Sequence, residues 1–185
     1  MLSQLIQSAI NAIKSLFAAK PPAPVGACAT GKTSLNCLGT AAEQTQLSTY
    51  VESIRNAGPQ GKAFVESLEQ APTQTQLSIA KSAQDKFGKV IPLKATGGGV
   101  TLRPTESLSG HNEVYVDPTH LIDYTATDGS TVKETPAGLL LHEMGHAAQL
   151  NAGDAAQTTG GPDAEANVRT LTNPIRQELG MKPER

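Results

Sequence analysis

Apolar residues recur with helical spacing in several stretches of this chain, and each stretch predicts a helix. The stretches are residues 2–17, 41–56, 62–70 and 136–152. Shorter apolar stretches bounded by glycine or proline predict strands at residues 77–79, 90–93, 100–102 and 113–116. A helix over residues 73–87 fits the first of these almost equally well, so both interpretations stay open. The pair Asp128-Gly129 predicts a hairpin over residues 124–132. We therefore expect an α+β fold with a small mixed or antiparallel sheet.

The amino-terminal part of the chain has a composition of its own. The first acidic residue is Glu43, and the segment before it is rich in Ser, Ala, Pro and Thr. Residues 2–17 form an amphipathic pattern that polar residues interrupt, and no basic region precedes it, so it is not a Sec signal peptide. We expect residues 1–38 to be a largely disordered secretion leader and Pro-rich linker, open to a secretion chaperone, and residues 39–185 to fold. An ordinary helix packed on the domain is the alternative for residues 2–17.

Charge and composition exclude several classes of function. Lys and Arg total 15 against 17 for Asp and Glu, which gives no pull towards nucleic acid or an anionic membrane. The chain has no Trp, so base-stacking platforms are not expected. No apolar run approaches the roughly 20 residues that span a bilayer, so we expect no transmembrane segment.

The segment His142-Glu143-x-x-His146 carries the most specific chemistry in the chain. Thr135 and Pro136 suit the start of a helix and Gly153 suits its end, so the motif falls in mid-helix. Residues four apart share one helix face, and two imidazoles there can converge on one zinc ion. Glu143 then lies beside the open coordination position, where a carboxylate can act as general base.

A catalytic zinc site needs a third protein ligand, and two histidines leave it one short. Gln149 and Ala152 stand where a third-histidine continuation of the motif would need Gly and His. Glu165 follows a Gly-Gly-Pro-Asp loop and opens a short helix expected over residues 164–171, which would present its carboxylate. Asp154 and Asp163 remain competing ligands, because aspartate also completes some sites of this kind.

The HExxH helix and the segments after it resemble a known group of enzymes. The residues that carry the resemblance are Leu140–Ala147, Glu165, Arg169 and Asn173–Gly180. Together they are similar to the gluzincin-type zincin metallopeptidases and, more narrowly, to the NleD-like effector zinc proteases of bacterial secretion systems. The resemblance covers roughly residues 98–185. It implies a zincin-like fold, in which the sheet packs on the HExxH helix and short helices follow.

The same resemblance implies a zinc endopeptidase that is delivered to a host cytoplasm and cuts a host signalling protein, such as a mitogen-activated protein kinase. Tyr124 is the expected oxyanion donor, and Tyr115, His111 and His120 are alternatives. Residues 112–116 are the expected edge strand that pairs with an extended substrate, with an ordinary sheet strand as the alternative. A catalytically inactive zinc-binding interaction module is the rival to an enzyme.

Two further features of the amino-terminal region are weaker signals. Residues 26–33 fit the GxxxxGK[ST] phosphate-loop pattern, but prolines precede them where a buried strand is needed, so nucleotide binding is a remote alternative. Cys28 and Cys37 fit no zinc ribbon, and we expect them to be unpaired in a reducing cytosol.

Overall fold

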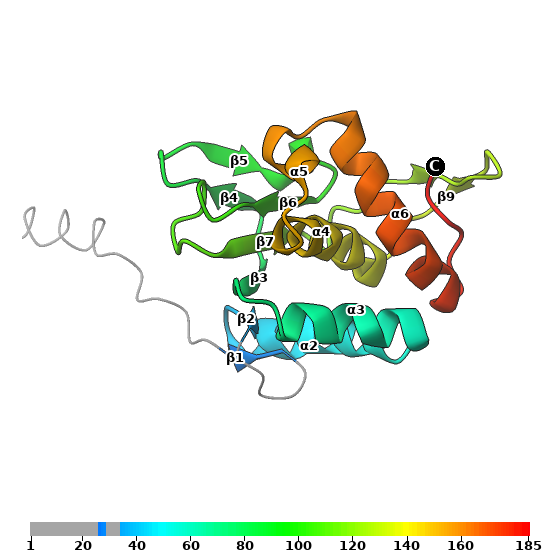
Figure 1. Cartoon of the computed structure of the whole chain (residues 1–185), viewed down its shortest axis with the longest axis horizontal. Coiled ribbons are helices and arrows are strands. Elements are labelled where there is room, and N and C mark those ends of the chain that lie inside the picture. Colours follow the sequence, from blue (N-terminus) through cyan, green and yellow to red (C-terminus); the bar gives the residue numbers. More distant parts are fainter. Residues whose placement is uncertain (1–25, 29–33) are drawn as a thin grey trace, which may run out of the picture.

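A computed structural model of the chain describes residues 26–28 and 34–185 (Figure 1). The expected leader at residues 2–17 and most of the phosphate-loop pattern lie outside the described residues. The fold is mixed α+β, as expected. Its helices are α2 (Ala41–Arg55), α3 (Pro59–Glu69), η1 (Leu93–Ala95), α4 (Pro136–Asn151), α5 (Ala155–Thr159) and α6 (Pro162–Glu178). Its strands are β1 (Gly26–Ala27), β2 (Leu35–Cys37), β3 (Thr75–Ile79), β4 (Ser82–Gln84), β5 (Val90–Pro92), β6 (Gly99–Leu102), β7 (Asn112–Val116), β8 (Tyr124–Thr125) and β9 (Thr131–Val132).

Five strands form one mixed sheet in the order β1-β2-β3-β7-β6. Strands β2, β3 and β7 are parallel, whereas β1 and β6 run antiparallel to their neighbours. Residues 75–79 form a strand, which decides the question left open between helix and strand. The expectation that residues 112–116 form an edge strand is wrong, because β7 pairs with β3 on one side and β6 on the other. The edge strands are β1 and β6.

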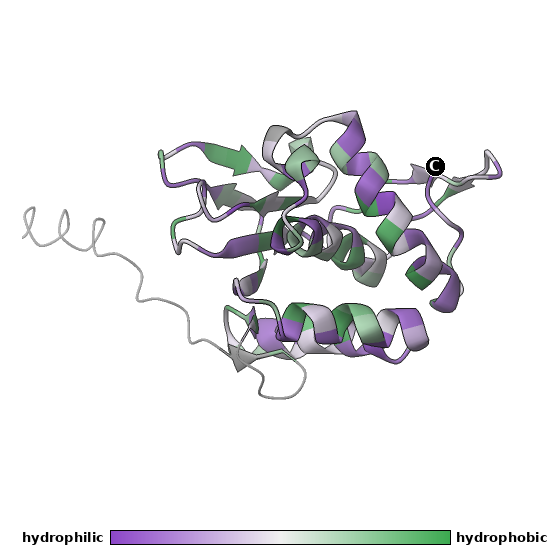
Figure 2. Ribbon diagram, viewed as in Figure 1, coloured by the Kyte–Doolittle hydropathy of each residue, from purple (hydrophilic) through white to green (hydrophobic). Residues whose placement is uncertain are grey.

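One pair of helices packs on the sheet, and a second pair packs on the first. Helices α2 and α4 pack against the sheet, while α6 packs on α4 and α3 on α2 (Figure 1). Parts of α3 and α4 are coloured as hydrophobic (Figure 2), and their buried apolar residues belong to one core cluster. The largest fully buried apolar side chains of the core are Leu35, Leu47, Val51, Ile54, Leu68, Leu77, Leu140, Leu141, Met144 and Ile175. The core therefore rests on aliphatic side chains.

Two helices begin in different ways. At the start of α2, the Thr40 hydroxyl accepts from the amide of Glu43 (3.3 Å), and the Glu43 carboxylate accepts from the amide of Thr40 (2.7 Å). Helix α3 has no such cap of its own at Gly58. The carboxylate of Glu178, at the end of α6, accepts from the amides of Gln60 (2.9 Å) and Gly61 (2.8 Å) instead. Glu178 therefore joins the outer two helices.

Cys28 and Cys37 form a disulfide, so the expectation of unpaired thiols is wrong. Strands β1 and β2 are antiparallel neighbours with Gly26 opposite Cys37, so Cys28, two residues after Gly26, lies on the same face as Cys37 and diagonally from it. Both side chains are fully buried in the core. The two strands lie before the boundary expected at residue 38, yet they belong to the main sheet.

Within residues 26–28 and 34–185, no helix combines the length and the apolar character needed to cross a bilayer.

Candidate metal centre

Helix α4 presents the HExxH motif from the middle of the fold. Its first turn is capped by the Thr135 hydroxyl, which accepts from the amide of Gly138 (3.0 Å), and Pro136 occupies the first turn. The helix stops at Asn151, and Gly153 adopts a φ of 75° just beyond it. Both ends agree with the sequence-based expectation. The motif consequently lies between the sheet and α6, with Glu143 buried and the two histidines half-buried.

Gly145 sets the distance between α4 and α6. A Cβ atom at this position would lie 2.9 Å from side-chain carbons of Val168 and Thr172 on α6, closer than real Cβ atoms come. Glycine therefore permits the close crossing of these helices. Helix α6 is also longer than expected, since it runs from Pro162 to Glu178 and includes Pro174. Its first turn, which carries Glu165, is held beside the histidines of α4.

Three side chains converge at the crossing: His142, His146 and Glu165, as expected. The Nε2 atoms of the two histidines are 3.3 Å apart. One Glu165 oxygen lies 3.2 Å from Nε2 of His142, and the other lies 3.4 Å from Nε2 of His146. Among the described residues this group has the composition and the spacing to hold a metal ion.

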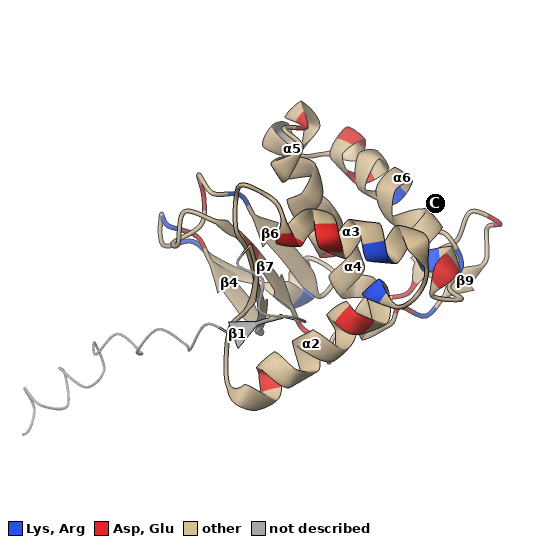
Figure 3. Ribbon diagram, turned by 60° about the horizontal axis from the view of Figure 1, so that its bottom comes forward, with Lys and Arg blue, Asp and Glu red and all other residues tan. Residues whose placement is uncertain are grey.

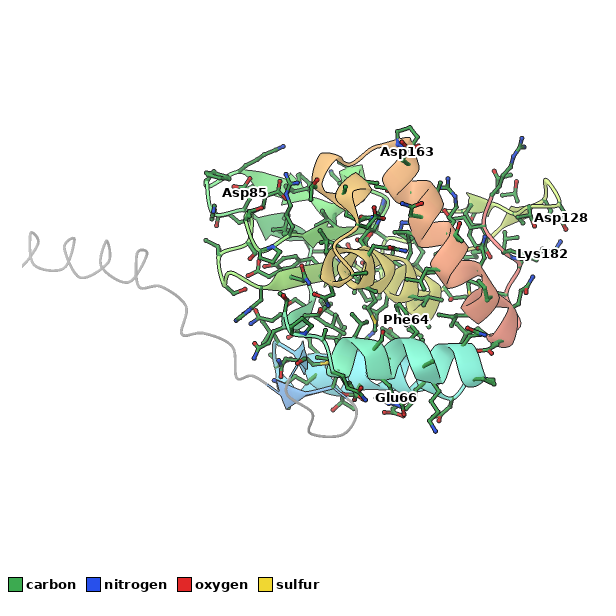
Figure 4. All side chains as sticks on the ribbon, viewed as in Figure 1. Phe64, Glu66, Asp85, Asp128, Asp163 and Lys182 are labelled. Carbon is green, nitrogen blue, oxygen red and sulfur yellow. A yellow bond between two sulfur atoms is a disulfide. The ribbon has the colours of Figure 1, made fainter. Side chains whose placement is uncertain are left out.

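The two aspartates that competed with Glu165 are placed elsewhere. Asp154 caps α5, accepting from the amide of Ala156 (2.9 Å), and its other oxygen accepts from the side chain of Asn167 (2.8 Å). Asp163 is exposed at the outer end of α6 (Figure 4). Neither carboxylate lines the cavity around the histidines. Glu165 is therefore the acidic residue of the group.

The outer nitrogens of both histidines have fixed partners. Gln157 donates its amide nitrogen to the carbonyl of Ala164 (3.1 Å), so its oxygen, 2.8 Å from Nδ1 of His146, must accept from that ring. Nδ1 of His142 lies 3.4 Å from the Glu184 carboxylate. With hydrogen on both Nδ1 atoms, the Nε2 lone pairs face each other and the Glu165 carboxylate. Three lone-pair donors directed at one point require a cation between them.

The pKa values of these side chains reflect the same need for positive charge. Burial alone would lower the pKa of His142, but hydrogen bonds with Glu165 and Glu184 outweigh it and raise the pKa to about 10. The two histidines hold the pKa of Glu165 well below its ordinary value. In the absence of a metal, protons therefore supply the positive charge, and a metal ion must displace them.

Glu143 is positioned by the edge strand. The Thr101 hydroxyl lies 2.8 Å from its Oε2 and 2.9 Å from its backbone carbonyl, so it can donate to either. Gly99 lies so close that a Cβ there would be 2.5 Å from Oε1. Burial raises the pKa of Glu143, although both histidines oppose this effect. The carboxylate is thus a stronger base than an exposed glutamate and is fixed in orientation.

A cavity of about 470 Å³ opens over these groups. The three residues of the metal group, Glu143, strand β6 and the loop before α6 all line it, and Arg103 and Glu106 line it as well. Arg103 donates to the Thr158 carbonyl and to the Glu106 carboxylate (2.6 Å). The cavity is therefore lined by Glu143, by the metal group and by β6, which has a strand neighbour on one side alone.

The expected oxyanion donors do not line this cavity. The Tyr124 hydroxyl donates to the carbonyl of Lys182 (2.7 Å), and its ring lies under the Arg176 guanidinium. Tyr115 donates to the carboxylate of Glu113 (2.9 Å). His111 and His120 are also absent from the lining. In this structure none of the four stands where a donor to substrate is needed.

Sequence reasoning missed the residues that support the metal group. Gln157, Glu184 and Thr101 act through the ligands or through Glu143 and belong to no motif. Arg176 is fully buried, and it pairs with Glu134 (2.9 Å) and with Glu184 (3.3 Å). Arg176 itself was the one signal in the sequence. An arginine on the buried face of a helix needs acidic partners, so its position predicts that such partners lie nearby.

Comparison with known proteins gives no relative: no family model, no curated protein and no solved structure matches the chain significantly.

Proposed function

We propose that this protein is a zinc-dependent endopeptidase with a zincin-like active site. The observation that carries the proposal is the spacing of the three candidate ligand groups: the Nε2 atoms of the two histidines are 3.3 Å apart, and the two Glu165 oxygens lie 3.2 Å from one of them and 3.4 Å from the other. A tetrahedral zinc site with bonds of about 2.1 Å has ligand–ligand distances of about 3.4 Å. Two imidazoles and one carboxylate also match the ligand set of catalytic zinc sites with a fourth position open.

A zinc ion held by this group would polarise a peptide carbonyl and make a nearby water more acidic. The chain's own residues would do the rest. Glu143 lines the same cavity, and its raised pKa suits it to take a proton from the attacking water and return it to the leaving amine. Thr101 keeps the carboxylate directed into the cavity. Gln157 and Glu184 hold the two imidazoles in the orientation that ligation needs.

Strand β6 supports a peptide as the substrate. Residues 99–101 line the cavity, and β6 is one of the two edge strands of the main sheet. An extended peptide could add to this edge as a further antiparallel or parallel strand, with its carbonyl over the metal group. The edge strand therefore takes the role that the sequence analysis gave to residues 112–116.

The test compares the zinc-loaded parental chain with the Glu143→Gln variant on a complex peptide library, with new peptide ends read by mass spectrometry. The parental chain should create new ends, and Glu143→Gln should keep equal zinc content while losing this activity by at least about a thousandfold. Glu165→Gln should instead lose zinc. A library left intact by the zinc-loaded parental chain would favour the inactive zinc-binding module.

We further propose where the protein acts and on what kind of substrate. The resemblance to secreted effector proteases supports delivery to a host cell and a host signalling protein as substrate. The buried Cys28–Cys37 disulfide favours folding in an oxidising compartment before any such delivery, because thiols in a cytosol are kept reduced. Nucleotide binding gains no support, since residues 29–33 of the phosphate-loop pattern lie outside the described part of the chain.

A further inference from the structure

The hairpin β4–β5 carries an unusual combination of side chains at its tip. Phe87 is 75% exposed and Val90 is 57% exposed, although both are large apolar residues. The hairpin lies on the side of the molecule away from α6, and Asp85 near its tip is at that end of the molecule (Figures 1 and 4). Strand β5 is coloured as hydrophobic in Figure 2. Exposure of this kind costs free energy and indicates a binding surface when the residues cluster.

A neighbouring loop adds to the same surface. The amide of Lys86 donates to the carbonyl of Glu106 (2.8 Å), which joins the hairpin tip to the loop after β6. Two residues further along that loop, Leu108 is 65% exposed. We call Phe87, Val90, Leu108 and the lysines described next the hairpin patch. Three of the four exposed large apolar residues of the described chain belong to it.

The charges of the patch are positive and unbalanced. Lys86, Lys89 and Lys94 are exposed, and none of them has a carboxylate within ion-pair distance among the described residues. The ammonium of Lys86 lies 5.3 Å from the centre of the Phe87 ring. Basic segments lie at this loop end of the molecule, with acidic segments among them (Figure 3). The overall charge of −2 therefore conceals a local basic surface.

The tip is also held in a fixed shape. The carboxylate of Asp85 accepts from the amides of Phe87 and Lys89, both at 2.9 Å, and Gly88 turns the chain with a φ of 85°. Both amides bond to the same oxygen of Asp85, so this carboxylate holds the turn. The fixed turn therefore keeps the Phe87 side chain exposed to solvent.

We propose that the hairpin patch binds the surface of an anionic phospholipid membrane. A convex tip can bury its apolar residues against a rigid protein only if that protein offers a matching pocket. A lipid interface deforms around a protruding aromatic residue, and its negative headgroups attract the surrounding lysines. Both the shape and the charge of the patch therefore fit a membrane. The contact does not depend on the proposed peptidase activity, although Glu106 places the patch beside the cavity.

Sedimentation of the full-length protein with phospholipid vesicles tests the proposal. The protein should bind vesicles of mixed phosphatidylcholine and phosphatidylserine, should bind phosphatidylcholine alone far more weakly, and should dissociate at high salt. Lys86→Glu/Lys89→Glu should reduce binding by at least about tenfold, and Phe87→Ser by roughly fivefold or more. Both changes are on an exposed turn, and circular dichroism checks that the variants remain folded.

Matched controls exist elsewhere on the chain. Lys62→Glu/Lys133→Glu makes the same change in net charge at two exposed lysines away from the patch, and Ile122→Ser alters another exposed apolar residue, 51% exposed. Both controls should bind vesicles as the parental protein does.

Equal loss in the control and patch variants would overturn the proposal. Undiminished binding by the patch variants would also overturn it and assign the contact to another segment. Binding of poly-glutamate without vesicle binding would point to an acidic protein partner instead.

Discussion

The carboxylate of Glu184 lies between two cations, 3.4 Å from Nδ1 of His142 and 3.3 Å from the guanidinium of Arg176. The side-chain amide of Asn173 fixes the backbone of Glu184 from both directions, by accepting from its amide (2.7 Å) and donating to its carbonyl (2.8 Å). The segment after α6 therefore supports the metal group from behind, on the side of His142 opposite the cavity.

Removing the charge of Glu184 should weaken metal binding without removing a ligand. Glu184→Gln takes the negative charge from the far side of the His142 ring, and such supports are worth about ten- to a hundredfold in affinity. Zinc affinity can be measured by competition with a chromophoric chelator. Asp163→Asn, an exposed acid on the same helix as Glu165, is the control and should keep the parental affinity. Equal affinities for Glu184→Gln and the parental protein would contradict this role.

Metal affinity should rise with pH. Because the pKa of His142 in the metal-free protein is about 10, its ring holds a proton at neutral pH, and a metal ion must displace it. Each displaced proton makes the apparent affinity rise about tenfold per pH unit below that pKa. Titration calorimetry between weakly acidic and neutral pH, in buffers of different ionisation enthalpy, should show release of at least one proton. An affinity independent of pH would mean that the histidine is already neutral.

The ligands could be predicted from the sequence because they follow from local geometry. A helix with polar residues four apart and clear end signals fixes the two histidines, and a loop followed by a helix start places Glu165. The choice among Glu165, Asp154 and Asp163 needed the crossing of α4 and α6, which depends on the space at Gly145. That packing is a tertiary property and leaves no periodic pattern.

The order of the strands could not be predicted from the sequence for a similar reason. Residues 112–116 read correctly as a strand, but only pairing decides whether a strand lies at an edge or inside a sheet. The disulfide was missed because two cysteines alone do not determine pairing, whereas the antiparallel register of β1 and β2 does. The length of α6 was underestimated because it continues past Pro174, held by buried residues such as Val168 and Ile175.

Gly145→Ala should destabilise the protein, contrary to the usual effect of this substitution in a helix. In an open helix interior alanine is favoured over glycine by about 1 kcal/mol. Here the new methyl group would meet Val168 and Thr172, and overpacking of this kind costs about 1–3 kcal/mol. Displacement of α6 should also move Glu165 and weaken zinc binding. Urea unfolding and the chelator competition measure the two effects, and a more stable variant would show that the crossing can relax.

Glu178 should contribute to stability through α3 and not through its own helix. Its carboxylate accepts from two amides at the start of α3, which has no other cap. Glu178→Ala should lower the free energy of unfolding by about 1–2 kcal/mol, as loss of a helix cap does. Zinc affinity should not change, because Glu178 is at the opposite end of α6 from Glu165. Glu178→Gln should recover part of the loss, since its oxygen can still accept a hydrogen bond.

The Cys28–Cys37 disulfide should stabilise the folded chain without being part of the metal centre. It closes a short loop, with a sequence separation of 9, and the entropy removed from the unfolded chain by a loop of this size corresponds to about 2–3 kcal/mol. Cys28→Ser/Cys37→Ser adds the cost of two buried hydroxyls, so Cys28→Ala/Cys37→Ala is the sharper variant. Its melting temperature should fall and should no longer respond to reductant, whereas the parental protein should lose stability when reduced.

Zinc affinity measured below the transition should be the same for both proteins, because β1 and β2 lie at the edge of the sheet opposite β6. A parental melting temperature unaffected by reductant would show that the thiols are not joined in solution.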